Sequence, residues 1–497
     1  MEKGVMYSDA LTLIEPQNHT GSEPRQNPDC SIQVNGTTKS LTLFVPQNFQ
    51  IDTLLKENPP IFKGAYRDKF IYIVHLISDF PTRRKDHEFK DGFIPLYAPL
   101  LRRRLGDTYR KHLDYLISLN VLEESKQYIV GKKSKGFKFT SAYNTPIKPI
   151  QITKKTLIKS IQKFIDLEES NISFITPNND ISYLKKWYNS DLSIDLKRAD
   201  NYLQNLKKNQ ENIFSYNYSP NSTKTYNSRL IPVLKIHEGQ FFPTIDRSAG
   251  RLHSTLTQLK SELRQFVTYK GETLVSIDIK NSQPYMSCVF FNQDCFIKSK
   301  IEEKLSLFNT TYKSTSSKPY NTFLYYVSKN WGATEKNKNV KQFIELVSNG
   351  VFYEEFGNLL YDKGYINGGN IRKQAKNITF RTFFSPNQHK GFSKEIQIFQ
   401  KTFPDVYKIF SLIKKGKQQH NSLACLLQNF EARLVLGIAC KKVAESFPNA
   451  PIFTLHDSII TTENYVNEVQ RIMSETLLEN VGIKPTLQIE TWKTEDN

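Results

Sequence analysis

Apolar residues recur at helical intervals over much of the first third of the chain. The pattern turns helical from about residue 61, and within residues 96–121 apolar positions follow i, i+4, i+7 and i+8 spacing, which places them on one helix face. These positions are Tyr109, Leu113, Leu116 and Ile117. Residues 1–55 show little periodicity and are rich in Asn, Thr, Ser, Pro and Gln, so we expect a poorly ordered N-terminal arm.

Two short apolar runs surround a basic tip in residues 128–139, YIVGKKSKGFKF. Two helices followed by a basic hairpin are typical of a winged-helix DNA-binding module, in which one helix enters a groove and the hairpin lies along a phosphate ridge. We therefore predict such a module over residues 56–145, with Arg110 and Lys133 among its nucleic-acid-binding residues. The alternative is a small helical subdomain whose cations only form a solvated face.

Residues 146–235 contain amphipathic segments with many lysines, over 152–167 and 181–206. We expect helices there that form a linker and whose lysines contact duplex phosphates without reading sequence. A solvated lysine face is the alternative. The Ser-, Asn- and Tyr-rich stretch 215–228 breaks the helical pattern and indicates a loop.

Two strand-like apolar runs each end in an aspartate. TLVSID ends at Asp278, and PIFTLHD ends at Asp457, 179 residues further along. Mg²⁺ takes hard oxygen ligands, commonly one or two carboxylates plus substrate phosphates, and paired ions suit phosphoryl transfer. The pattern favours a two-metal site formed by Asp278 and Asp457. Taken alone, each aspartate could equally be a turn residue or a helix cap.

A third segment, IRKQAKNITFRTFFS, carries two cations and then two aromatic rings at intervals of four residues. These are Arg372, Lys376, Phe380 and Phe384. Each step of four advances 400° around an α-helix, so the row stays on one face. Cations on such a face can bind a triphosphate, and rings can cover the base or sugar of a nucleotide. An amphipathic helix with a basic end is the alternative.

The net charge of the chain indicates what kind of molecule it binds. The 497 residues include 68 Lys+Arg and 49 Asp+Glu, a formal net charge of +19. A phosphate backbone is the partner that such an excess favours, ahead of a membrane surface. No run approaches the roughly 18 to 20 apolar residues of a spanning helix, and the N-terminus lacks the order of a signal peptide. Five scattered cysteines argue against a disulfide framework and against cysteine metal sites. We expect a soluble cytoplasmic protein, associated with the nucleoid, with no membrane partner.

Taken together, these segments resemble family A DNA polymerases. That family carries RxxxKxxxFGxxYG on its fingers helix, and this chain has RKQAKNITFRTFFS in the same frame. Four further segments resemble family motifs in the same order. GRLHSTLTQLKSELRQFV resembles the start of the palm, and SIDIKNSQPYMS resembles motif A. ACLLQNFEARLVL is similar to the NxxxQGxAAD helix, and LHDSI resembles motif C. In the NxxxQGxAAD match only Gln428 and Ala432 align. The resemblance covers about residues 241–492.

The resemblance implies a role for each aligned residue. Asp278 and Asp457 would hold two Mg²⁺ ions, with Mn²⁺ as a substitute, and Lys376 would assist the departing pyrophosphate as a third catalytic residue. The nucleotide would be bound by Arg372, Lys376, Phe380, Phe384 and Gln283. Primer–template DNA would be contacted by Arg251, His456 and Gln428.

Three departures from the family bear on sugar choice. Gln283 stands where the DNA polymerases have a Glu that blocks a ribose 2′-hydroxyl, and its similar bulk keeps a steric barrier. Phe384 lacks the hydroxyl with which the related single-subunit RNA polymerases help to select ribose, whereas His-Asp-Ser at 456–458 matches the RNA enzymes better. The balance favours deoxyribonucleotides. Arg381 replaces a family Gly and would contact template phosphate or face solvent.

The resemblance implies an α+β right-hand polymerase with palm, fingers and thumb, behind the winged-helix-like module. We place the thumb or linker in 146–235 and the palm and fingers in 236–497, with the fingers at about 296–395. The expected activity is template-dependent addition of dNTPs to a DNA primer 3′ end, replicating a phage, plasmid or transposon, with a helicase or primase as a further partner. The N-terminal half lacks an Asp-x-Glu exonuclease opening, so we expect no proofreading. The alternatives are a small single-subunit RNA polymerase or primase, a replication initiator, and a defence protein with a repurposed palm.

Overall fold

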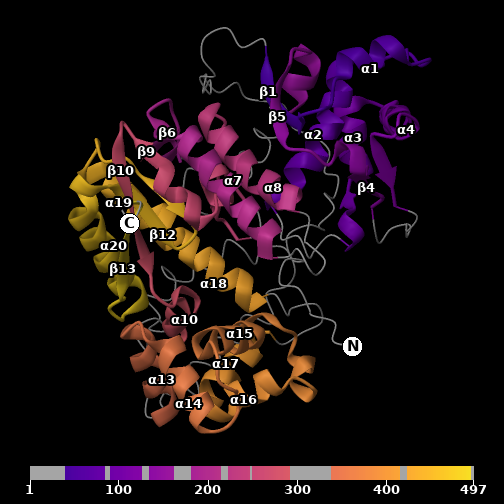
Figure 1. Ribbon diagram of the computed structural model, residues 1–497. Coiled ribbons are helices and arrows are strands. Elements are labelled where there is room, and N and C mark those ends of the chain that lie inside the picture. Colours follow the sequence, from indigo (N-terminus) through magenta and orange to yellow (C-terminus); the bar gives the residue numbers. More distant parts are fainter. Residues whose placement is uncertain are drawn as a thin grey trace, which may run out of the picture.

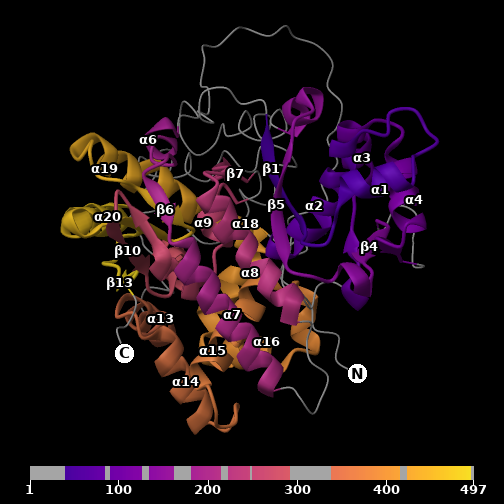
Figure 2. The same cartoon turned by 45° about the horizontal axis from the view of Figure 1, so that its top comes forward.

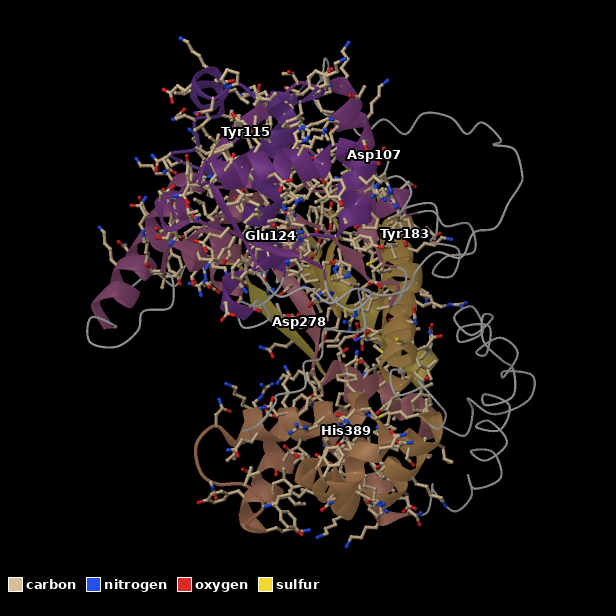
Figure 3. The ribbon with its side chains drawn as sticks, turned by 90° about the vertical axis from the view of Figure 1, so that its right-hand side faces the viewer. Asp107, Tyr115, Glu124, Tyr183, Asp278 and His389 are labelled. Carbon is tan, nitrogen blue, oxygen red and sulfur yellow. The ribbon has the colours of Figure 1, made fainter. Side chains whose placement is uncertain are left out.

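The computed structural model arranges the chain in three groups of elements, an N-terminal group, a central sheet with its helices, and a helical group (Figure 1). Seen from the side in Figure 3, the N-terminal group and the helical group lie at opposite ends, with Asp278 of the sheet between them. The structure describes residues 40–83, 90–125, 134–161, 181–213, 222–246, 249–291, 337–414 and 422–493.

The N-terminal group combines helices with a small three-stranded sheet. Its helices are α1 (Ile51–Glu57), α2 (Arg67–Arg83), α3 (Ala98–Leu105) and α4 (Tyr109–Ser118). The strands β2 (Ile94–Pro95), β3 (Leu122–Glu124) and β4 (Gly136–Phe139) form an antiparallel sheet in the order β2-β4-β3. Gly106 ends α3 with φ 81°, a conformation that suits glycine and lets the chain turn into α4 within a few residues. Residues 131–133 of the predicted basic tip, including Lys133, lie outside the described residues, whereas Lys135 is described.

Part of the segment that we expected to be a poorly ordered arm is regular structure. Residues 41–46 form β1 (Leu41–Pro46), which pairs antiparallel with β5 (Ile147–Ile152), and α1 follows. Successive side chains of β1 face opposite ways, so Leu43 and Val45 enter the core of the N-terminal group while Phe44 enters the core of the sheet. This strand has too few residues to stand out from its Asn- and Gln-rich surroundings, which is why periodicity missed it.

The central sheet has six antiparallel strands in the order β11-β12-β10-β9-β6, with β13 also pairing β10. The strands are β6 (Leu192–Ile194), β9 (Val267–Tyr269), β10 (Glu272–Ile279), β11 (Phe453–Leu455), β12 (Ser458–Thr462) and β13 (Leu487–Thr491). The predicted amphipathic segment 181–206 is therefore not one helix. It contains a short helix, α6 (Ser182–Lys185), the edge strand β6 and the start of α7 (Leu196–Ile213), because β6 pairs with β9.

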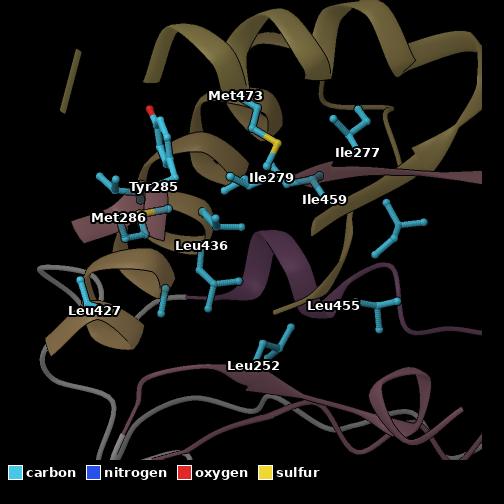
Figure 4. Packing of buried hydrophobic residues seen from close by; sticks show 14 of the residues in the cluster. Leu252, Ile277, Ile279, Tyr285, Met286, Leu427, Leu436, Leu455, Ile459 and Met473 are labelled. Carbon is cyan, nitrogen blue, oxygen red and sulfur yellow. The ribbon is translucent and has the colours of Figure 1, made fainter. Parts of the chain in front are cut away.

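Apolar side chains from the sheet and its covering helices form one core beneath the strand ends (Figure 4). The helices that contribute are α10 (Ser282–Ser287), α18 (Ser422–Ala432) and α20 (Val466–Val481). Ile277 and Ile279 of β10 and Tyr285 and Met286 of α10 belong to this core. Packing of this kind fixes the start of α10 relative to the last residues of β10.

The helical group packs around phenylalanine rings. Its helices are α13 (Lys338–Ser348), α14 (Phe352–Asp362), α15 (Ile371–Phe384), α16 (Lys394–Thr402) and α17 (Pro404–Ile413). The fully buried rings include Phe343, Phe352, Phe356, Phe383, Phe399, Phe403 and Phe410. The helix predicted over 371–385 is confirmed as α15, and Lys414 caps its end by donating to the carbonyl oxygens of Thr382 and Ser385.

A continuous helical rod, Ser422–Ser446, links the helical group to the sheet (Figure 1). It comprises α18, the π-helical stretch Arg433–Cys440 and α19 (Lys441–Ser446). By length and a mean hydropathy of 1.4 it could cross a membrane, yet 67% of that window is buried inside the protein. Such burial is typical of a core helix. Among the described residues, it alone meets the length and hydropathy of a spanning helix.

The N-terminal group is docked on the rest of the protein through α8 (Ser222–His237). Figure 2 shows α7 and α8 between that group and the sheet. At the contact of α2 with α8, Lys235 forms an ion pair with Asp79, and the two side chains are only 4% and 6% exposed. The Phe44 amide donates to His75 of α2 (3.1 Å). A buried ion pair and a strand shared between two cores make this a fixed contact rather than a flexible tether.

Candidate active site

Strand pairing brings Asp278 next to Asp457. Asp278 is the next-to-last residue of β10 and lies opposite Ser458, the first residue of β12. Asp457 precedes Ser458 in the tight turn from β11, where His456 has φ 58°. The Asp278 carboxylate accepts hydrogen bonds from the hydroxyls of Ser458 and of Ser276, the latter over 3.0 Å. These two bonds fix the orientation of one carboxylate beside the other.

The two aspartates open into a cavity of about 650 Å³. The sheet, α10 and α18 supply one side of its lining, and α14 and α15 of the helical group supply the other. Figure 3 shows Asp278 at the level where the sheet faces the helical group. The sequence-predicted residues that line the cavity are Arg251, Asp278, Gln283, Arg372, Lys376, Phe380, Phe384, Gln428, His456 and Asp457.

The predicted face of α15 lies in this cavity as one row. The Arg372 Nε donates to Glu354 of α14 (2.7 Å), and both side chains are about half exposed. The Lys376 ammonium lies 5.4 Å from the Phe380 ring centroid, and the rings of Phe380 and Phe384 are 5.4 Å apart. Within the described part of the chain, Lys376 forms no ion pair. Its charge is therefore available to an anion in the cavity.

Glu431 is a cavity residue that the sequence analysis missed. It is fully buried on α18 and pairs with Arg251, whose Nε donates to it over 2.9 Å. The Ser282 hydroxyl (2.5 Å) and the Gln283 amide (2.7 Å) donate to its other oxygen. The sequence offered one indication of this role: Glu431 follows Gln428 by three residues, which puts both side chains on one helix face. Glu431 thus adds a further carboxylate to the cavity wall, beside Asp278 and Asp457.

Crowding of carboxylates changes the titration of Asp457. Burial, followed by the negative charges of Glu431 and Asp278, raises the pKa of Asp457 to about 7. The neighbouring His456 shifts the other way, because burial and the positive charges of Arg251 and His253 lower its pKa to about 4. His456 is therefore a neutral ring at pH 7, whereas Asp457 is about half protonated there, because its negative charge lacks enough compensating positive charge.

Tyr353 of α14 is a second residue that sequence reasoning did not find. Its ring is 4% exposed and lies 5.8 Å from the Arg372 guanidinium and 6.0 Å from the Lys376 ammonium, measured to the ring centroid. Burial raises the pKa of its hydroxyl. No local pattern marks this tyrosine, because its contact with α15 depends on how two helices pack.

Several buried polar atoms around the cavity have no hydrogen-bond partner among the described residues. These atoms are Asn281 Nδ2, Gln283 Oε1, Glu354 Oε2 and His456 Nδ1. Buried polar groups in proteins are nearly always paired, and each exception calls for an explanation such as a bound ligand. Four unpaired atoms around one cavity indicate that it takes a polar ligand.

The carboxylates suit a hard divalent cation. Among the described residues, no three His, Cys, Asp or Glu side chains gather in a way that would hold a metal ion by themselves. Mg²⁺ is commonly held by one or two carboxylates, completed by waters and substrate phosphates. Asp278 and Asp457 offer such a pair, and the raised pKa of Asp457 indicates a place where added positive charge is favourable. These residues fit Mg²⁺ together with a phosphate ligand.

Two other predicted residues lie elsewhere. Arg110 of α4 forms ion pairs of 2.6 Å with both Asp114 and Glu124, which raise the pKa of its guanidinium, and Lys133 lies outside the described residues. Arg381, predicted to contact template or solvent, pairs with Glu395 of α16. These arginines are held by internal carboxylates.

No family model and no curated protein matches the chain. One similar solved structure is the POL domain of Pol1 from M. smegmatis in complex with DNA primer-template and dNTP. It has 10% sequence identity and a TM-score of 0.38, over 68% of this chain and 73% of that chain. The roles of individual residues therefore rest on the cavity itself.

Proposed function

We propose that this chain is a template-dependent DNA polymerase that adds deoxynucleotides to a primer 3′ end. The observation that carries the proposal is that residues far apart in sequence meet in one cavity. Asp278 and Asp457 come from adjacent strands, and Arg372 and Lys376 come from the facing helix α15. Paired carboxylates opposite a cationic and aromatic helix face suit a nucleoside triphosphate with its metal ions.

In this proposal the sheet is the palm, the helical group is the fingers, and α7 and α8 form the thumb. Asp278 and Asp457 would hold Mg²⁺, which supplies Lewis-acid activation of the attacking oxygen and charge stabilisation at the phosphate. Ser276 and Ser458 keep the Asp278 carboxylate oriented through their hydrogen bonds. A metal ligand held this way is preorganised before substrate arrives.

The reaction is a phosphoryl transfer in which the primer 3′ oxygen bonds to the α-phosphorus and the bond to the bridging oxygen of pyrophosphate breaks. Arg372 and Lys376 bind the triphosphate and neutralise the charge that develops on the departing pyrophosphate. Phe380 covers the sugar, and Phe384 stacks near the templating base. Arg251, His456 and Gln428 line the same cavity and contact the primer–template near its end.

The N-terminal group is the DNA-binding module of this enzyme. Two helices joined by a short turn and followed by a hairpin, with sheet order β2-β4-β3, support a winged-helix-like arrangement. Its fixed contact with α8 would hold bound duplex at a constant position relative to the palm. The proposed biological role is replication of a phage, plasmid or transposon, without proofreading.

A single-subunit RNA polymerase or primase is the second candidate. The observation that favours it is the His-Asp-Ser order at 456–458, in which the Ser458 hydroxyl donates to Asp278. The two candidates differ in the nucleotide they use and in their need for a primer.

Primer extension separates these functions. Purified protein is given a primed template, an unprimed template or a primer alone, with Mg²⁺ and either four dNTPs or four rNTPs. The DNA polymerase assignment requires extension with dNTPs that depends on both primer and template. Efficient synthesis with rNTPs on an unprimed template would move the assignment to the second candidate. Extension of the primer without template would overturn both.

A further inference from the structure

An exposed tyrosine of the N-terminal group has two lysines beside its ring, on a surface separate from the cavity. Tyr66 is 52% exposed and comes directly before α2. The ammonium of Lys154, which follows β5, lies 3.1 Å from the centroid of this ring, and the ammonium of Lys69 lies 5.7 Å from it. Figure 3 labels Asp107, at the turn from α3 to α4 beside which Lys69 lies, well away from Asp278.

Hydrogen bonds from three chain segments hold this group of residues in place. The buried Asp68 carboxylate accepts from the backbone amides of Thr153 (2.7 Å) and Lys154 (2.6 Å), which fixes Lys154 beside the start of α2. The Lys69 ammonium donates to the carbonyl oxygen of Leu105, the last residue of α3 (2.6 Å). The fold therefore brings one ring and two cations together from segments that are distant in the sequence.

The positive charges of these two lysines are not neutralised by a carboxylate. Neither lysine forms an ion pair among the described residues, and the Asp68 carboxylate is shared between the two amides and Arg67 (3.3 Å). Burial and the positive charge of Lys154 lower the pKa of Lys69. Arg110 of the same group differs, since two carboxylates hold its guanidinium. An anion from outside the protein would relieve the repulsion between the two ammonium groups.

A second cation–aromatic pair lies at the turn beside Lys69. The Arg102 guanidinium of α3 lies 6.0 Å from the centroid of the Tyr109 ring of α4, and its ion pair with Asp107 (3.2 Å) is exposed to solvent. Aromatic rings beside cations are typical of surfaces that bind single strands, because the cations bind phosphates while the rings stack on bases. Bases inside a duplex are already stacked on one another, so an exposed ring favours an unpaired strand.

We propose that Tyr66, Lys69 and Lys154 form a binding surface for single-stranded DNA, in which the Tyr66 ring stacks on an unpaired base and the two ammonium groups bind the neighbouring phosphates. The inference rests on the proposed DNA-binding role of the N-terminal group and names the form of the strand and the residues that bind it. Because this surface is separate from the cavity, one strand can be held at both places, which raises the overall affinity for DNA.

The test is fluorescence anisotropy of the full-length protein with a labelled oligothymidylate of about 20 nucleotides, at several salt concentrations and without Mg²⁺ or nucleotide. Tyr66→Ala should weaken binding about tenfold, because stacking on one base is lost, and Tyr66→Trp should stay within about threefold of wild type, because it keeps a ring. Lys154→Ala should reduce the slope of log affinity against log salt by about 0.7, the contribution of one phosphate contact on a single strand.

Tyr97→Ala is the matched control. Tyr97 lies in the same group, directly before α3, and is 53% exposed, but no lysine or arginine of the described residues lies over its ring. This variant should bind the oligothymidylate within about twofold of wild type. A loss as large as that of Tyr66→Ala would overturn the assignment of the surface to Tyr66.

A duplex of the same length tests the form of the strand. Tyr66→Ala should change duplex affinity by less than about twofold, because paired bases do not stack on the ring. Equal losses with both oligonucleotides would overturn the single-strand assignment, as would an effect of Lys154→Ala with none of Tyr66→Ala. Either result leaves the polymerase assignment in place. Absence of primer extension by wild type would instead overturn that assignment and would not alter the binding measurement.

Discussion

Charged side chains of the cavity and of the N-terminal group differ in whether they form ion pairs within the protein. In the N-terminal group, Arg110 pairs with two acids, and Lys135 pairs with Glu124 over 2.6 Å. In the cavity, Asp278 and Asp457 form no ion pair with a cation among the described residues. Lys376 likewise forms no ion pair with a carboxylate there. Charges left without internal partners cost stability and are therefore expected where a ligand supplies the partner. The difference places the chemistry at the cavity, whereas Arg110 and Lys135 of the N-terminal group serve internal ion pairs.

The sharpest test of this comparison removes the carboxylates. Asp278→Asn and Asp457→Asn should each lower primer extension by about a thousandfold or more, because each removes a ligand for the metal ion. Without Mg²⁺ at pH 8, Asp457→Asn should also raise the unfolding midpoint by about 3 °C, because it removes a crowded anion. Steady-state extension and thermal unfolding measure the two effects.

The paired acid Asp114 provides the control. Asp114→Asn should leave extension within about twofold of wild type and should lower rather than raise the unfolding midpoint. Retained primer extension in Asp457→Asn, or a lower unfolding midpoint for that variant, would contradict the view that the cavity carboxylates bind a cation.

The cations of α15 should give the next largest effect. Lys376→Ala and Arg372→Ala should each raise the KM for the nucleotide by about 10- to 100-fold while leaving primer–template affinity nearly unchanged. Arg381→Ala is the matched control on the same helix, since its guanidinium is already paired with Glu395, and should change KM less than about threefold. Equal losses of nucleotide and DNA binding would indicate that Lys376 only maintains the fold.

Acidification should weaken metal binding by about tenfold per pH unit below 7. Asp457 has its pKa raised to about 7, and a protonated carboxyl must lose its proton before it binds a cation. Because folding raises this pKa, protonation of the Asp457 carboxyl stabilises the metal-free fold. This stabilisation is complete below pH 3.8, the ordinary pKa of an aspartate, and it is lost as the pH rises through 7. Calorimetric titration of Mg²⁺ at pH 6 and pH 8 measures the change. Equal affinities at the two pH values would show that Asp457 is not a ligand.

Arg110→Ala should give the smallest effect on binding. Its guanidinium is neutralised by Asp114 and Glu124, so duplex DNA affinity should change about twofold or less, and the half-exposed pairs should contribute about 1 kcal/mol to stability. Fluorescence anisotropy with a short duplex measures the affinity. A loss greater than tenfold would mean that Arg110 exchanges its carboxylates for phosphate, which would break the contrast between the two regions.

Local patterns predicted those parts of the site that depend on neighbouring residues. The run before Asp278 is β10, and the row from Arg372 to Phe384 lies on one face of α15, because strand and helix periodicities are set by backbone geometry. Patterns were less reliable where a segment depends on a distant partner. The strands β1 and β6 exist because they pair with β5 and β9, and nothing within these short segments indicated that pairing.

The sequence by itself determined the charge excess, the helix face on α15 and the two strand ends that carry aspartates, since each follows from composition or from spacing within a few residues. Only the tertiary structure decided that these features meet in one cavity, that Glu431 and Tyr353 join them, and that Arg110 and Arg381 are held by internal acids. The physical reason is that a side chain's charge partners, burial and pKa depend on residues brought close by strand register and helix packing, at separations that no local period encodes.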